Sequence, residues 1–195
     1  MERKTIGILF SGGLESTCLV SHYKSLEYDI SLVYIKYGYI WENIEIRYAK
    51  RIAKYYKVKL YELDYSRIFN TTQLGLVKNK KQNIIPLRNL SLLVSSALFF
   101  FNIGILKLAI GIQKDLNYPD TDEEYLYSIE KLISKGLNIT FKIETPFYND
   151  NKKTLIEKYT DIPLKLIFSC TNPINNKRCH TCYKCNLLDN LINDI

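Results

Sequence analysis

The sequence lacks a hydrophobic run long enough to cross a membrane. A spanning helix needs roughly 20 consecutive apolar residues, and the longest apolar stretch, residues 90–112, is interrupted by Asn102, Gly104 and Lys107. The residues after Met1 also lack the pattern of a signal peptide, because a β-branched segment follows them directly. We therefore expect a cytoplasmic protein that makes no contact with a membrane.

The chain also lacks internal repeats and any linker long enough to separate two large domains. Its 195 residues and 47% hydrophobic content suffice for a substantial core. The net charge of +7 suits a polyanionic partner such as ATP, or RNA. The one dense basic cluster, residues 78–81, is better explained as a solvated loop than as an RNA-binding patch. A nucleic-acid partner is therefore not expected.

A Ser-Gly-Gly turn between two apolar runs is the most informative stretch. Residues 4–10 have the pattern of a buried strand, and residues 17–23 continue at helical spacing. Glycines let the backbone approach an anion closely, and the free N–H groups at the start of a helix attract negative charge. The residues expected to bind a nucleotide phosphate here are Leu9, Phe10, Ser11, Gly12, Gly13, Leu14, Glu15, Ser16 and Thr17.

The spacing of this turn excludes two common phosphate sites, the Walker A loop and the dinucleotide-binding G-x-G-x-x-G. It resembles instead the S-G-G-x-D-S loop of the ATP pyrophosphatase (PP-loop) superfamily, whose members split ATP at the α-phosphate and transfer AMP to an acceptor. Glu15 stands where the superfamily has Asp. An ordinary strand–turn–helix junction is the plain alternative.

The order of the remaining patterns predicts an α/β fold, with a five-stranded parallel sheet of Rossmann-like type and helices on both faces. Further strands are expected at residues 29–36, 58–63, 106–112 and 139–145, and helices at residues 41–56, 90–102, 123–136 and 151–159. We expect Ile44, Tyr48, Ile52 and Tyr55 to share one face of their helix.

Local signals mark several boundaries of these elements. Asn89 is a suitable N-cap for the long apolar helix, and Gly136 is a suitable end for the helix that begins at Glu123. The polar stretch 70–83 carries no period, so we expect a mobile loop that covers the site as a lid. Acidic residues after the fourth strand stand where open α/β sheets bind ligands.

The last part of the chain predicts a metal site. Cys170, Cys179, Cys182 and Cys185 form a C-x₈-C-x₂-C-x₂-C pattern, which matches a closed tetrahedral Cys₄ zinc centre with a structural role. An iron–sulfur cluster, a redox C-x-x-C pair and disulfides remain alternatives. His180 is expected to be a non-ligand, and Cys18 a core residue. We expect a PP-loop ATP-binding domain over residues 1–165 and a zinc module over residues 166–195.

Motifs spread over almost the whole chain strengthen the resemblance. After the Ser-Gly-Gly loop come Pro86-Leu87-Arg88-Asn89, Gly111, Asp115, Tyr118-Pro119-Asp120, Thr145-Pro146 and the four cysteines. In this order they resemble the 7-cyano-7-deazaguanine synthase family, with its adenine nucleotide α-hydrolase-like fold. The resemblance implies a ligase that converts 7-carboxy-7-deazaguanine and ammonia to 7-cyano-7-deazaguanine (preQ0) in queuosine or archaeosine biosynthesis. It also implies ATP with Mg²⁺ as co-substrate, and a homodimer.

The resemblance also assigns roles by position. The residues placed at the nucleotide are Ser11, Gly12, Gly13, Glu15, Ser16, Arg88, Asn89 and Gly111, and the catalytic set is Ser11, Glu15, Arg88, Asp115, Asp120 and Lys153. Arg88 would neutralise phosphate or carboxylate charge, and Asn89 would orient the substrate. Asp115 and Asp120 would contact the guanine-like edge or Mg²⁺, and Lys153, with Lys152 equally near, would lie at the phosphates. Plainer roles are a surface charge for Arg88, a helix cap for Asp120 and a solvated lysine for Lys153.

Other departures from the family pattern fall on the acceptor side. Tyr39-Ile40-Trp41 stands where the family has Gln-Arg-His, and Thr121-Asp122 where it has Cys-Arg. An acidic group at Asp122 would disfavour a carboxylate beside it. Two alternatives therefore stay open: a divergent PP-loop enzyme that adenylates another acid or a protein terminus in a modification or defence system, and a non-catalytic zinc protein that binds nucleotide or RNA.

Overall fold

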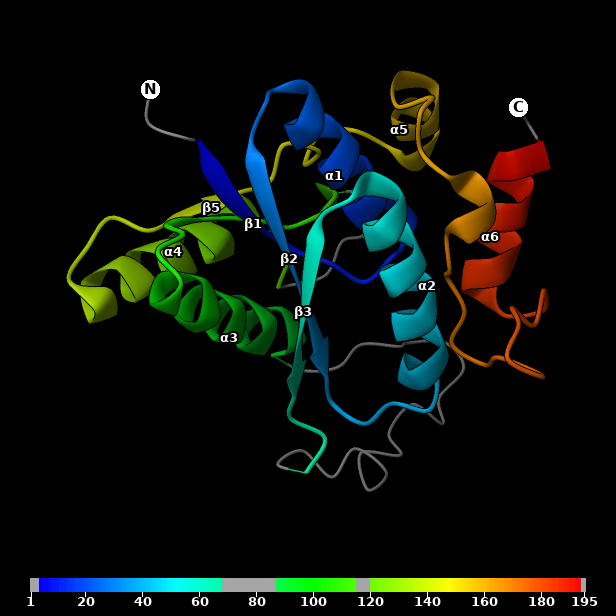
Figure 1. Ribbon diagram of the computed structural model, residues 1–195, viewed down its shortest axis with the longest axis horizontal. Helices are drawn as coiled ribbons and strands as arrows, with labels where there is room; N and C mark the ends of the chain where they lie inside the picture. Colours follow the sequence, from blue (N-terminus) through cyan, green and yellow to red (C-terminus); the bar gives the residue numbers. More distant parts are fainter. Residues whose placement is uncertain (1–3, 68–86, 115–119, 194–195) are drawn as a thin grey trace.

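The computed structural model describes residues 4–67, 87–114 and 120–193. Its centre is one sheet of five parallel strands in the order β3-β2-β1-β4-β5 (Figure 1). The strands are β1 (Thr5–Leu9), β2 (Asp29–Lys36), β3 (Lys59–Asp64), β4 (Lys107–Ala109) and β5 (Lys142–Glu144). The predicted parallel α/β sheet is confirmed, although β4 and β5 are shorter than the apolar runs that predicted them.

Helices cover both faces of the sheet, as the strand–helix alternation predicts. They are α1 (Leu14–Ser25), α2 (Glu42–Tyr56), α3 (Arg88–Asn102), α4 (Glu123–Leu137), α5 (Lys152–Lys158) and α6 (Tyr183–Asn193), with a short 3-10 helix, η3 (Leu164–Leu166). In Figure 1, α1, α2, α5 and α6 lie on one side of the sheet and α3 and α4 on the other. Two separate apolar clusters follow this division.

The central strands are apolar on both sides because each face is covered by a helix layer. Side chains alternate across a strand, so Leu32 packs toward the α1 and α2 layer and Val33 toward α3 and α4. Both side chains are fully buried. This two-sided burial explains why β2 reads as a continuous apolar run and not as an alternating one.

The strand order places the topological switch point between β1 and β4. The chain moves outward from β1 through β2 to β3, and then returns to the other side of β1 with β4. In open parallel sheets, ligands bind at such a point, beyond the carboxyl ends of the strands. The Ser-Gly-Gly turn follows β1 and Gly111 follows β4, so both lie at this place.

Two local expectations are wrong. The helix α4 continues through Gly136 to Leu137, and its C-cap is Asn138, which takes the left-handed conformation at φ +52°. The helix α3 already begins at Arg88, so Asn89 lies inside its first turn and Leu87 is the N-cap. Tyr55 shares a face of α2 with Ile44, Tyr48 and Ile52 but is 54% exposed, because the buried residues of α2 include Ile46, Ala49 and Ala53.

The C-terminal segment shares its packing with the rest of the chain. Leu188 of α6 belongs to the same apolar cluster as residues of α1 and β1. Phe168, Cys170 and Cys185 form a further small cluster, against which Ile44 and Tyr48 of α2 pack. A division of the chain at residue 166 therefore remains a proposal. Among the described residues, no helix is long and apolar enough to cross a membrane.

Candidate functional site

The Ser-Gly-Gly turn exposes backbone donors at the start of α1. Gly12 takes φ +76°, a conformation that L side chains rarely adopt, and an added Cβ would lie 3.1 Å from the backbone of Ala49. Gly13 is the N-cap of α1 and has extended backbone. The first bond of the helix runs from Thr17 N to Gly13 O. The N–H groups of the preceding turn therefore have no acceptor within the helix and can bind an anion.

Hydroxyl groups line the same turn. Thr17 Oγ1 donates to Gly13 O at 2.7 Å, and Ser16 Oγ donates to the same carbonyl at 3.2 Å. Ser11 Oγ accepts from Gly13 N at 3.3 Å and lies 3.4 Å from Ser16 Oγ. These bonds fix the turn and hold Ser11 and Ser16 side by side.

Other residues of the predicted nucleotide-binding stretch contribute through the backbone. The side chains of Phe10 and Leu14 are buried in the core, with 1% and 3% exposure. Phe10 N donates to Val33 O at 2.8 Å, which ties the end of β1 to β2. Leu9 is the last residue of β1. Phe10 and Leu14 therefore anchor the turn, and their side chains face away from any ligand.

A lysine from α5 joins the turn at Glu15. Lys152 Nζ makes an ion pair with Glu15 Oε1, while the neighbouring Lys153 is exposed to solvent. Burial, and then the nearby Lys184 ammonium, lower the pKa of Lys152 to about 8, whereas contact with Glu15 favours its charged form. The structure thus brings Lys152, and not Lys153, to the start of α1, beside the Ser-Gly-Gly turn.

Gly111 lies against the same turn from the β4 side. An added Cβ would lie 2.7 Å from Glu15 Cβ and 3.2 Å from Glu15 C. No real Cβ tolerates such contact, so only glycine lets the end of β4 approach α1 this closely. Gly111 therefore belongs to the site through packing against Glu15.

Arg88 and its neighbours lie where α3 begins. Arg88 Nε is buried and has no hydrogen-bond partner among the described residues. Asn89 Nδ2 donates to Asp120 O at 3.1 Å, and Asp120 Oδ2 accepts from Asn89 N at 3.3 Å. Asp120 thus caps α3, a helix distant in sequence. Asp115, the loop 70–83 and the basic cluster 78–81 lie outside the described residues.

A second group of charges connects α2, α3 and α6. Glu45 is half-buried, and desolvation raises its pKa, while its carboxylate accepts a 2.7 Å hydrogen bond from Tyr34 OH. Lys184, which stands between two of the cysteines, interacts electrostatically with Arg88 and Glu45. Burial, and then the Arg88 guanidinium, lower the pKa of the Lys184 ammonium. Neither Glu45 nor Lys184 was expected at the site.

The turn after β2 is held by a buried carboxylate. Glu42 accepts backbone N–H bonds from Tyr37, Gly38 and Tyr39 at 2.7–3.1 Å. Burial raises its pKa, and these hydrogen bonds oppose the rise. The rings of Tyr39 and Trp41 are stacked with centroids 4.8 Å apart. The stretch that departs from the family pattern therefore forms an aromatic pair at the carboxyl edge of the sheet.

Asp122 has a structural partner within its own helix. It is the N-cap of α4, and its Oδ1 accepts from Glu124 N at 2.7 Å. An N-cap carboxylate is stabilised by the N–H groups of the first turn. Asp122, which stands at the family's Arg position, therefore stabilises the start of α4. The helix N–H groups partly neutralise its charge before any acceptor binds.

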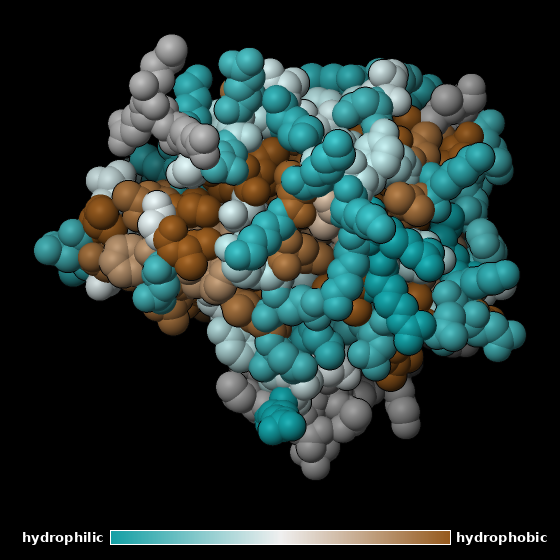
Figure 2. Space-filling view, in the orientation of Figure 1, coloured by the Kyte–Doolittle hydropathy of each residue, from teal (hydrophilic) through white to brown (hydrophobic). Residues whose placement is uncertain are grey.

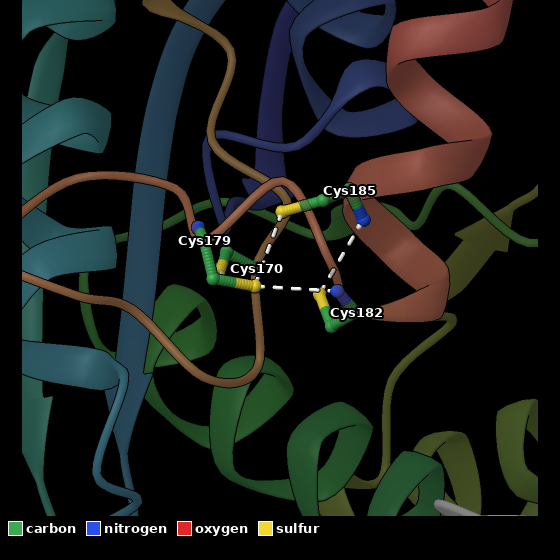
Figure 3. Close-up of side chains that lie close together, drawn as sticks. All are labelled: Cys170, Cys179, Cys182 and Cys185. Atoms are coloured by element: carbon green, nitrogen blue, oxygen red, sulfur yellow. Dashed lines mark hydrogen bonds between the residues drawn. The ribbon is translucent and has the colours of Figure 1, made fainter.

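The four cysteines converge, as the sequence predicts (Figure 3). Their ligand atoms all lie within 4.8 Å of one another. Cys170 Sγ lies 3.6 Å from Cys179 Sγ, and Cys179 Sγ lies 3.9 Å from Cys185 Sγ. Four thiolates on one tetrahedral ion with metal–sulfur bonds of about 2.3 Å would lie about 3.8 Å apart. The cluster can therefore hold a metal ion.

Backbone N–H groups donate to three of the sulfur atoms in this cluster. The N–H groups of Cys179, Cys182 and Cys185 donate to the preceding sulfur at 3.3–3.4 Å. Although burial raises the pKa of Cys179, hydrogen bonds from Thr181 and Cys182 lower it to about 6. Cys18, by contrast, is fully buried in the core, where desolvation raises its pKa to about 12.

The cysteine segment contacts the Ser-Gly-Gly turn directly. Phe168 N donates to Gly12 O at 3.2 Å. Within the cysteine segment, Arg178 Nη2 donates to Cys185 O at 3.0 Å and to the Asp189 carboxylate at 2.6 Å. His180 Nδ1 lies 2.8 Å from the same carboxylate. His180 is thus bound to Asp189 and stands apart from the metal-ligating set, as expected.

This combination defines a class of protein. A parallel sheet whose first strand leads through Ser-Gly-Gly into a helix, with a cysteine cluster beside that turn, is the arrangement of an ATP-utilising PP-loop protein. Two solved structures share the fold. One is a 4-thiouridine synthetase–RNA complex with bound ATP, with a TM-score of 0.61 and 14% identity, over 98% of this chain and 50% of that chain. The other is a U34-tRNA thiolase from Methanococcus maripaludis with its [4Fe-4S] cluster, with a TM-score of 0.60 and 16% identity, over 100% of this chain and 68% of that chain.

The chain belongs to the family described as "Queuosine biosynthesis protein QueC", whose model matches residues 5–191. It is similar to 7-cyano-7-deazaguanine synthase 1 of Desulfitobacterium hafniense, with 28% identity over 95% of this chain and 90% of that protein. It is also similar to the 7-cyano-7-deazaguanine synthase of Methanococcus maripaludis, with 27% identity over 96% of this chain and 87% of that protein. It is thus a divergent member of this family.

Proposed function

We propose that the protein is an ATP-dependent carbon–nitrogen ligase that converts 7-carboxy-7-deazaguanine and ammonia to 7-cyano-7-deazaguanine. The family match across nearly the whole chain carries the proposal. Further support comes from the glycine turn at the switch point, with Glu15 and Lys152 at its edge. The product places the protein in queuosine or archaeosine biosynthesis.

The ATP half of the reaction fits the groups around the turn. The substrate carboxylate attacks the α-phosphate of ATP, and the bond between the α- and β-phosphates breaks to release pyrophosphate. The N–H groups at the start of α1, with the Ser11 and Ser16 hydroxyls, bind the phosphate oxygens. Lys152 and Arg88 supply positive charge, which stabilises the departing pyrophosphate. Mg²⁺ accompanies ATP as its counter-ion.

The acceptor half requires two activations. Ammonia attacks the acyl adenylate, AMP leaves, and an amide forms. The amide oxygen then attacks the α-phosphate of a second ATP, which releases a second pyrophosphate, and loss of AMP and two protons gives the nitrile. Arg88, whose Nε has no partner among the described residues, is the group we assign to the carboxylate by a paired hydrogen bond. Because Asn89 and Asp120 bond each other, we assign them to holding Arg88 in place.

We propose that the cysteine cluster holds one structural zinc ion. Four thiolates leave no open position for a substrate. The sulfur separations of 3.6 and 3.9 Å suit a single ion, whereas a four-iron cluster spreads its thiolates over separate iron atoms. Metal analysis of the purified protein tests the assignment: about one zinc and no iron per chain is expected, and a chain loaded with iron and sulfide would contradict it.

We also propose a homodimer. Exposed apolar side chains gather over α3 and α4, among them Val94, Leu98, Tyr127 and Leu132 (Figure 2). Such a patch is typical of an interface between protein chains. Light scattering should show a dimer that Leu98→Glu converts to a monomer, while Leu26→Glu, at an exposed apolar residue at the end of α1, leaves it intact. A monomeric native chain would exclude the proposal.

The reaction itself is tested with purified protein, ATP, ammonium and 7-carboxy-7-deazaguanine, followed by mass spectrometry. The expected result is loss of mass from carboxylate to amide and then to nitrile, with release of pyrophosphate and AMP. If ATP is cleaved only when another acid or a protein terminus is supplied, the acceptor is wrong. If ATP binds and is never cleaved with any acceptor, the protein is a non-catalytic nucleotide-binding relative.

A further inference from the structure

The peptide that joins Gly12 to Gly13 has little local constraint. Neither residue has a Cβ, so side-chain sterics do not fix how this peptide plane is turned. Gly12 takes φ +76° and Gly13 takes φ −75°. Turning the plane over would bring Gly13 to positive φ, which glycine adopts readily, and would reverse the direction of its N–H. Groups outside the peptide therefore decide which way this N–H points.

Hydrogen bonds hold the same peptide from opposite sides. In a trans peptide the C=O and the N–H point in opposite directions. The Gly12 carbonyl accepts from Phe168 N at 3.2 Å, while Gly13 N donates to Ser11 Oγ at 3.3 Å. The bond to Ser11 is long, so a phosphate oxygen can replace it. The bond from Phe168 orients the peptide without occupying any donor that an anion needs.

Phe168 is itself held independently of the turn. Its ring is 1% exposed and stacks on the ring of Tyr48 in α2, with centroids 4.9 Å apart. The backbone of Ala49, the next residue of α2, lies 3.1 Å from the place of a Cβ on Gly12. Two residues after Phe168, Cys170 joins the cysteine cluster. The segment that donates to the turn is therefore fixed by α2 and by the cluster.

We propose that Phe168 is a positioning residue for nucleotide binding, whose N–H turns the Gly12–Gly13 peptide so that the Gly13 N–H faces the phosphates of ATP. This inference rests on the ATP half of the proposed function. Without the bond, both orientations of the peptide are accessible, and the affinity falls with the fraction of chains in the competent one. The plainer alternative is that Phe168 only fills space between α2 and the cysteine cluster. In that case its ring matters and its N–H does not.

Phe168→Pro and Phe168→Ala form a matched pair that separates these roles. Both remove the ring, and only proline removes the N–H. Ile167 has φ −67° and ψ +126°, the extended conformation that a residue before proline needs. Binding of inorganic pyrophosphate with Mg²⁺ to the metal-loaded variants is measured by calorimetry. Phe168→Pro should have a Kd about 3- to 10-fold above that of Phe168→Ala, the range expected for one hydrogen bond. Equal Kd values in the two variants would overturn the inference.

A second measurement uses the native chain, in case the variants do not fold. Amide hydrogen exchange is followed by NMR with and without pyrophosphate. The Phe168 N–H should be protected in both states, because its bond to Gly12 exists before the anion binds. The Gly13 N–H should gain protection when pyrophosphate is added. A Phe168 amide that exchanges like an exposed one, or a Gly13 amide that pyrophosphate leaves unchanged, would contradict the positioning role.

The inference and the proposed reaction can fail separately, since pyrophosphate binding needs no acceptor. Failure to form the nitrile, together with weaker pyrophosphate binding in Phe168→Pro than in Phe168→Ala, would refute only the reaction. Nitrile formation by the native chain, together with equal binding in the two variants, would refute only the role of Phe168.

Discussion

Replacing Gly111 with alanine tests whether the close approach of β4 to α1 builds the phosphate site. The added Cβ would lie 2.7 Å from Glu15 Cβ, 3.2 Å from Glu15 C and 3.4 Å from Ser16 N. None of these atoms is the free end of a flexible side chain. Relief therefore requires α1 to move away from β4 by several tenths of an ångström.

The expected cost follows from overpacking of a close contact. Such insertions destabilise by about 1–3 kcal/mol, which for a chain of this size lowers Tm by roughly 2–12 °C. The same shift moves the N–H groups of α1 and the ion pair between Glu15 and Lys152. A small displacement of binding groups can reduce turnover by about 10- to 100-fold. ATP-dependent release of pyrophosphate should fall by that amount.

Gly136 provides the matched control. It lies inside α4, and an added Cβ there meets no atom within 4 Å. Gly136→Ala should stabilise the protein by about 0.5–1 kcal/mol, because alanine loses less entropy in a helix. Chemical unfolding and pyrophosphate release are measured on both variants. Native stability and native turnover in Gly111→Ala would refute the packing argument, since the close contact would then be without consequence.

Three other predictions follow from separate features. Cys182→Ser should lower the bound metal below one equivalent per chain and destabilise the C-terminal helix. Metal analysis and thermal unfolding measure these two effects. Unchanged metal content would exclude the Cys₄ assignment. Lys152→Ala should reduce ATP turnover about tenfold or more, while Lys153→Ala stays near native, and equal effects would contradict the observed ion pair with Glu15. Burial, and then Lys158, lower the pKa of His22 below its usual 6.5. The unfolded chain therefore binds more protons just below that pH, and stability should fall on acidification. His22→Gln should make the denaturation midpoint depend less on pH just below 6.5, and an unchanged slope would refute the assignment.

The sheet could be predicted from the sequence because its strands are buried on both faces. Such burial leaves a continuous apolar signature in the run from Asp29 to Lys36, whose predicted bounds match β2. The cysteine cluster was equally predictable, since the spacing of Cys179, Cys182 and Cys185 already restricts how the thiols can point. Both features depend on local chemistry that neighbouring residues determine.

The side chains at the site were less predictable because they depend on how helices dock. Successive residues on a helix point about 100° apart, so the choice between Lys152 and Lys153 depends on where α5 begins and how it lies against α1. The Asn151 side chain caps this helix by accepting from Thr154 N at 2.9 Å. Lys184 and Glu45 approach each other only through the packing of α6 near α2, for which the sequence carries no periodic signal.

The hydrogen bond between Phe168 N and Gly12 O has a consequence for how the protein is made. The glycine turn is synthesised well before the segment that braces it. A nascent chain that has emerged only as far as β5 therefore holds its entire sheet and still lacks the bond from Phe168 that supports the turn. A chain truncated before Phe168 would be in the same state.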